Sequence, residues 1–166
     1  MVTVLGQNQY GKAEVRIVRV SRDTVPHRVK DLTVGIALSG DLAATHLTGD
    51  NSAVLPTDTA KNTVYALARQ HGIACIEEYG GLLARHFVDT QPAIHRARVR
   101  IEEYGWSPIA SPAFPHSFVR DGGEVRTTEV VRDGSGLRIV SGVTGLIVMN
   151  TTASEFRGYV KDRYTT

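Results

Sequence analysis

The sequence lacks the residues and spacings of several common functional sites. Its single cysteine, Cys75, cannot form a disulfide within the chain and lies in an apolar helical pattern, which indicates a reducing compartment and a packing role. None of the six histidines occurs in an HExxH pattern or a close pair, and no phosphate-binding glycine loop or nucleophile elbow is present. The sequence therefore predicts neither a metal site nor a nucleotide-binding loop.

Long apolar runs and a dominant charge are also missing. The longest apolar runs, such as 146–149, are far shorter than the roughly 20 residues that cross a bilayer, and the N-terminus does not resemble a secretory signal. The net charge is only +2, with basic and acidic residues interspersed. We therefore predict a cytoplasmic protein, peroxisomal if eukaryotic although no targeting signal is visible, with no nucleic-acid or membrane partner.

The residues that are present predict one globular domain of mixed secondary structure. A length of 166 residues, with 42% hydrophobic and 22% charged residues, is enough to bury a core without staples. Apolar–polar alternation predicts strands, and apolar residues at helical spacing predict helices, the second weakened by two glycines. The expected strands are 12–20, 32–38, 93–101, 124–132 and 137–149, and the expected helices are 60–71 and 76–87, with a Pro-rich loop at 106–118.

The order of these elements predicts the fold class. Strands, then two helices, then strands favour an α+β fold, an antiparallel sheet with both helices on one face, over an alternating parallel fold. A lone sheet of this kind has two exposed edges, so we also expect the chain to associate with others.

The stretch LPTDTAKNTVY joins an extended segment to the first predicted helix. Thr57 or Asp58 at that junction predicts an N-cap, whose side chain accepts a hydrogen bond from an unpaired amide of the first turn. The alternative is a functional hydroxyl at a helix N-terminus, where free amides favour an anionic ligand.

Three segments carry a more specific signal: LGQNQYGKAEVRIVRV, GDNSAVLPTDTAKNTVYALAR and GLIVMNTTASEFRGYVKDRYTT. They resemble three segments of the urate oxidases (uricases), in the same order and at fitting separations, and the similarity spans about 4–166, loosely at 105–125. The resemblance implies the tunnelling fold, an antiparallel four-stranded sheet with two helices on one face, in strand-strand-helix-helix-strand-strand order. It also implies oxidation of urate by dioxygen and water to 5-hydroxyisourate and hydrogen peroxide, with neither metal nor organic cofactor.

The resemblance assigns four residues to the site. Lys12 of YGK and Thr57 of TD match the family's catalytic proton relay, in which an ammonium destabilised by burial acts as a base through a hydroxyl. Asp58 matches the residue that binds substrate chiefly through its backbone N–H, and Phe156 matches the aromatic residue on which urate stacks. From sequence context alone, Lys12 is a solvated lysine at a strand end and Phe156 a core residue.

Members of the family carry two tandem tunnelling-fold domains. The resemblance makes 1–166 the first domain, with the second absent from this chain and supplied by the rest of the polypeptide or a second chain. The histidine, arginine, glutamine and asparagine that complete the family's site belong to that second half. The family builds its site between subunits, usually of a homotetramer. Pro56 replaces an alanine, and Met149-Asn150 a Leu-Lys pair, without touching the chemistry.

Two other functions stay open. Some tunnelling-fold proteins use zinc for hydrolysis, which the absence of cysteine and histidine ligand spacing disfavours. The third possibility is a non-catalytic purine-binding or assembly module that keeps the scaffold.

Overall fold

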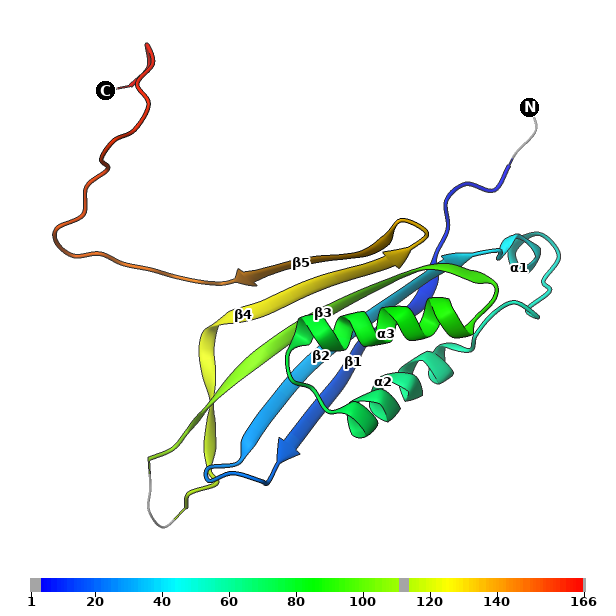
Figure 1. Cartoon of the computed structure of the whole chain (residues 1–166), viewed down its shortest axis with the longest axis horizontal. Helices are drawn as coiled ribbons and strands as arrows, with labels where there is room; N and C mark the ends of the chain where they lie inside the picture. The colour runs from blue at the N-terminus through cyan, green and yellow to red at the C-terminus, as the bar shows by residue number, and fades with distance from the viewer. Residues whose placement is uncertain (1–3, 111–113, 166) are drawn as a thin grey trace.

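The computed structural model describes residues 4–110 and 114–165, and within them one antiparallel sheet has the strand order β1-β2-β3-β4-β5. Two long helices lie side by side on one face of the sheet (Figure 1). The strands are β1 (Tyr10–Ser21), β2 (Arg28–Gly40), β3 (Ile94–Pro108), β4 (Phe118–Asp133) and β5 (Gly136–Thr144), and the helices are α1 (Ala43–Leu47), α2 (Thr57–His71) and α3 (Ile76–Thr90). None of the helices in the described ranges is long and apolar enough to span a membrane.

The predicted α+β class and element order are confirmed, with differences at the element ends. The short helix α1 was not predicted, and the sheet has a fifth strand beyond the four that the resemblance implies. β3 and β4 extend into the predicted Pro-rich loop, where Trp106 pairs with Arg120; residues 111–113 of that loop lie outside the described residues. This extension is exposed on both faces, so it carries no apolar–polar alternation. β5 ends at Thr144, five residues before the predicted end.

The core lies between the sheet and the two long helices. In the register of β2 and β3, Val34 pairs with Ile101 and Ile36 with Val99, so these buried side chains share the helix-covered face. Phe87 of α3 is fully buried against this layer. Apolar residues alternate with more polar ones along β2 and β3, so one face of the sheet has to be covered. The two long helices cover it.

Cys75 is not a packing residue inside a helix. It precedes α3 as its N-cap, and its Sγ accepts a hydrogen bond from the backbone N–H of Glu78 at 3.5 Å. The prediction was wrong because the apolar pattern of α3 starts one residue later, at the fully buried Ile76.

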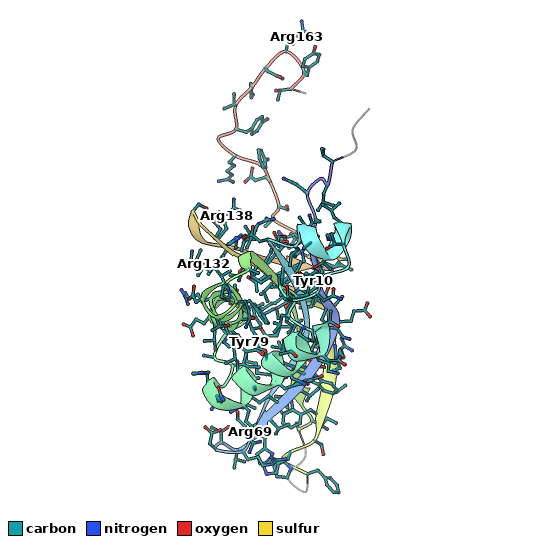
Figure 2. The ribbon with its side chains drawn as sticks, turned by 90° about the vertical axis from the view of Figure 1, so that its right-hand side faces the viewer. Tyr10, Arg69, Tyr79, Arg132, Arg138 and Arg163 are labelled. Carbon is teal, nitrogen blue, oxygen red and sulfur yellow. The ribbon has the colours of Figure 1, made fainter. Side chains whose placement is uncertain are left out.

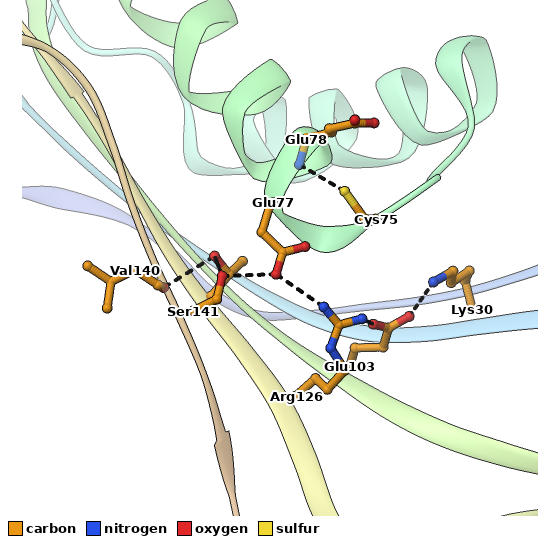
Figure 3. A network of polar contacts seen from close by, with 9 residues as sticks. Lys30, Cys75, Glu77, Glu78, Glu103, Arg126, Val140 and Ser141 are labelled. Atoms are coloured by element: carbon orange, nitrogen blue, oxygen red, sulfur yellow. Dashed lines mark hydrogen bonds and ion pairs between the residues drawn. The ribbon is translucent and has the colours of Figure 1, made fainter.

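A polar network fastens the start of α3 to the sheet (Figure 3). Glu77 accepts hydrogen bonds from Arg126 of β4 at 3.2 Å and from Ser141 of β5 at 2.9 Å. Arg126 also donates to Glu103 of β3 at 3.1 Å, and Glu103 accepts from Lys30 of β2. The arginine pairs with both carboxylates, so four strands are tied to a single turn of α3.

The two glycines of α3 occupy different surroundings, so alanine substitutions there should have opposite effects. A Cβ on Gly80 would lie 2.8 Å from Cγ2 of Val130, whereas a Cβ on Gly81 would meet nothing nearer than Leu137 at 3.5 Å. Gly81→Ala should raise the free energy of unfolding by about 0.5–1 kcal/mol, the helix-propensity gain. Gly80→Ala should lower it by about 1–3 kcal/mol through overpacking. Urea denaturation of both variants tests this, and equal effects would contradict the packing described.

The segment after β5 leaves the body of the domain. Residues 145–165 run as an extended chain away from the sheet (Figures 1 and 2), and Arg163 in Figure 2 lies far from the labelled residues of the helices. Its large apolar side chains are exposed, among them Ile147 at 90% and Val160 at 92%. Nothing within the described chain covers them.

Candidate active site at the start of α2

Tyr10 holds the segment before α2 against β1. Its hydroxyl accepts a hydrogen bond from the backbone N–H of Leu55 at 2.9 Å, a contact between residues 45 positions apart. Burial raises the pKa of Tyr10, and the Leu55 hydrogen bond opposes that rise. Tyr10 of YGK therefore holds the residues just before the TD motif in place, a role that was not predicted from the sequence.

The backbone of β1 is irregular at Lys12. Gly11 lies so close to β2 that an added Cβ would fall 1.9 Å from the carbonyl oxygen of Ile36, so only glycine fits. A bulge separates Lys12 from Val15, and Glu14 within it has a φ of 56°. Lys12 pairs with the buried Ile36, so its side chain projects from the helix-covered face. Bulges of this kind re-aim a side chain beside a site.

α2 begins one residue earlier than the capping prediction requires. Pro56 is the N-cap with no side-chain cap hydrogen bond, so Thr57 and Asp58 are the first residues inside the helix. The prediction that either caps was wrong, because Pro56 takes the half-in position and Thr57 already has helical backbone. The first helical hydrogen bond runs from Ala60 N–H to Pro56 C=O at 3.1 Å. The amides of 57–59 therefore precede the helical ladder, which leaves them free to bind an anion.

The carboxylate of Asp58 links this helix end to β1. Its Oδ1 lies 3.4 Å from Nζ of Lys12 and 3.1 Å from Nζ of Lys61. The side chains of Lys12 and Asp58 are 37% and 70% exposed, so solvent reaches the pair. The YGK and TD motifs, separate in sequence, meet at this point.

Hydrogen bonds from Lys61 and then Lys12 lower the pKa of Asp58 below its ordinary value of 3.8. Because the pKa of Asp58 is lower in the folded than in the unfolded state, its pairs with Lys61 and Lys12 stabilise the fold at pH values above the ordinary pKa of aspartate. That contribution should vanish as the pH falls through the lowered pKa. Carbon-detected NMR of the Asp58 carboxyl should show titration below that of a free aspartate, and Lys61→Gln should raise the midpoint. A midpoint at or above the free value would contradict the pairing.

The structure brings only some of the predicted site residues together. Thr57 is adjacent to Asp58 and exposed, and in the described ranges no hydrogen bond joins its hydroxyl to the Lys12 amine. Phe156 is 82% exposed on the extended segment, stacked at a tilt on Tyr159 with ring centroids 5.4 Å apart. Phe156 is therefore not the core residue that sequence context alone suggests, and within this chain it does not reach Lys12.

Lys61 is the site neighbour that sequence reasoning missed. It follows Asp58 by three residues on α2, which is the spacing that places two helical side chains on one face, so the signal was present in TDTAK. Across 4–110 and 114–165, no three histidine, cysteine or acidic side chains gather as metal ligands would.

A sheet in the order of two strands, two long helices and then antiparallel strands, with the YGK and TD motifs meeting where the first long helix starts, defines a tunnelling-fold domain. Comparison with known proteins gives the family. The uricase family model matches residues 8–131, so the chain belongs to the uricase family.

Named relatives agree with this placement. The chain is 46% identical to uricase from Arthrobacter globiformis over 163 residues, covering 98% of this chain and 53% of that protein. It is 37% identical to Aspergillus flavus uricase, covering 95% of this chain and 54% of the relative. The crystal structure of the Arthrobacter globiformis enzyme superposes with a TM-score of 0.85 at 45% identity, over all of this chain and 57% of that one. The chain thus spans about half the length of these relatives.

Proposed function

We propose that this chain supplies the first half of a urate oxidase active site. The complete enzyme would convert urate, dioxygen and water to 5-hydroxyisourate and hydrogen peroxide without a metal or organic cofactor. A second tunnelling-fold domain, in the same polypeptide or another chain, would complete the site, most simply in a homotetramer. We place the enzyme in the cytoplasm, or in peroxisomes if the source is eukaryotic. Below, "the complete assembly" means this chain together with that second domain.

One contact carries the proposal. The 3.4 Å pair between Lys12 and Asp58 brings YGK to the first turn of α2, immediately beside Thr57. A proton relay requires the amine and the hydroxyl to share one site, either in direct contact or through a water. The Lys12–Asp58 ion pair supports this requirement. The hydrogen bond from the Leu55 N–H to the Tyr10 hydroxyl supports it too, because it holds the segment before Thr57 against β1.

The chemistry asks the protein to move protons and to orient a planar anion. Loss of a proton makes urate electron-rich enough to reduce dioxygen by two electrons to hydrogen peroxide, after which water adds to the oxidised purine. In our proposal Lys12 takes the proton through the Thr57 hydroxyl, and the backbone N–H of Asp58 binds an acceptor atom of urate at the free end of α2. Orientation and exclusion of competing water would come from the complete assembly.

Phe156 would stack on urate in a neighbouring subunit, because its own chain leaves it exposed on a segment that runs away from the sheet (Figure 1). Stacking of a base on an aromatic ring is worth roughly 1–3 kcal/mol, so Phe156→Ala should raise the KM for urate by about 5- to 150-fold. Tyr164→Ala, on the same extended segment and 73% exposed, is the matched control and should change KM little. Equal kinetics of Phe156→Ala and the unmodified assembly would remove Phe156 from the site.

The assignment of the reaction is tested by following urate absorbance and oxygen uptake together in the complete assembly, with and without a chelator. We expect equal rates of urate loss and oxygen uptake that resist the chelator. Chelator-sensitive hydrolysis without oxygen uptake would instead indicate a zinc-dependent tunnelling-fold enzyme. Urate binding without oxygen uptake would leave a purine-binding or assembly module.

A further inference from the structure

The carboxylate of Asp58 is shared by two ammonium groups. Lys12 on β1 and Lys61 on α2 approach the same oxygen, Oδ1, at 3.4 Å and 3.1 Å. Lys61 approaches more closely, and both its amine and Asp58 stand on one face of the first two turns of α2. A single negative charge therefore faces two positive ones.

This sharing bears on the state of Lys12. A carboxylate beside an amine stabilises the protonated form, and a protonated amine cannot accept a proton. Asp58 acting on Lys12 alone would therefore oppose the role of a base. A second ammonium on the same oxygen weakens this opposition, because it competes for the carboxylate and adds positive potential nearby.

We propose that Lys61 is a positioning residue for Asp58. By binding the same carboxylate oxygen as Lys12, it weakens the attraction between Asp58 and the Lys12 ammonium, so that Lys12 can lose its proton and act as a base. The inference rests on the proposed function of Lys12 as a base. Lys61 acts through Asp58 and not on urate.

Few other ionisable groups of the described residues lie near this contact. The charges that act on Asp58 are those of Lys61 and Lys12. Along β1 the ionisable neighbours of Lys12 are Tyr10, which is hydrogen-bonded to Leu55, and Glu14 on the bulge. From β2 the residue opposite Lys12 is Ile36, which carries no charge. From β3, Arg98 and Arg100 line the same surface hollow as Lys12 and keep their charge over this pH range. Among the described residues of this chain, we therefore attribute a pH effect that appears on removing Lys61 to Asp58 and Lys12.

A purely structural role for Lys61 would give a different result. An i, i+3 pair stabilises a helix by roughly 0.2–0.5 kcal/mol, and its loss would lower activity equally at every pH. The proposal predicts a loss that depends on pH, and recovery when the charge is restored.

The test compares Lys61→Gln, Lys61→Arg and the unmodified protein in the complete assembly, from neutral to alkaline pH. For Lys61→Gln we expect kcat/KM to fall about 2- to 5-fold at neutral pH, as for an exposed pair, and to recover at alkaline pH. Lys61→Arg should behave like the unmodified protein. Arg69→Gln removes a positive charge from the last turn of α2, at the opposite end from Asp58 and remote from Tyr10 (Figure 2), and should leave the pH profile unchanged.

A second readout does not require activity. NMR of the isotopically labelled Lys12 side chain in this chain alone should show its titration midpoint move to higher pH in Lys61→Gln. An unmoved midpoint, superimposable pH profiles, or a Lys61→Arg variant as impaired as Lys61→Gln would each overturn the proposal. An unmodified assembly that consumes no urate would contradict the proposed function instead, and the NMR titration would still decide the role of Lys61.

Discussion

Lys12→Met should lower kcat for urate oxidation by about 10²- to 10⁴-fold in the complete assembly, the usual contribution of a positioned general base. Methionine keeps the length and apolar stem of lysine but cannot accept a proton. Lys12 lies at the edge of the core with its side chain 37% exposed, so the domain should stay folded. Initial rates of urate loss, with circular dichroism as a check on folding, measure the effect.

Lys12→Arg separates a base from a simple ion-pair partner. Arginine keeps the positive charge facing Asp58, but a guanidinium stays protonated in proteins. We expect Lys12→Arg to be nearly as inactive as Lys12→Met while the helix end remains paired. If Lys12→Arg retained most of the activity, the amine would serve only to hold Asp58.

Gly11→Ala should lower the free energy of unfolding by about 3 kcal/mol, the upper part of the range for overpacking. The added Cβ would meet backbone, 1.9 Å from the Ile36 carbonyl oxygen, and no side-chain rotation can relieve the clash. β1 would have to shift away from β2 beside Lys12, so activity should fall as well. Thermal and urea denaturation measure the loss.

Gly35→Ala is the matched control in the same hairpin. A Cβ there meets nothing within 4 Å, so its effect on stability should be small. If both substitutions had the same effect, the close approach of β1 and β2 at Gly11 would be contradicted.

Residues buried on one face were the ones that sequence reasoning placed well. The alternating pattern around Val34 and Val99 predicted two central strands, because the helices cover one face and leave the other open. The ends of β3 and β4 near Trp106 could not be predicted in this way, since exposed residues form them. Main-chain pairing and a hydrogen bond from Trp106 Nε1 to Asp31 of β2 at 3.0 Å maintain them. The start of α2 was misplaced because Pro56 was not considered as a cap.

The candidate site was predictable only through motifs. Neither composition nor periodicity distinguishes Lys12 from any strand-end lysine, and the resemblance alone singled it out. The pairing of Lys12 with Asp58 depends on how β1 packs beside α2, which a linear pattern does not specify. Phe156 is 82% exposed in this chain, and in our proposal it meets the ligand only in a neighbouring subunit, which one sequence does not specify.

The most direct test is a double-mutant cycle on the amine and the hydroxyl. kcat for urate is measured in the complete assembly for Lys12→Met, Thr57→Ala and the double variant. If both residues belong to one relay, the double variant should be no slower than the slower single variant, because the relay is already broken. Losses that multiply would show that Lys12 and Thr57 act independently, and would contradict the shared site.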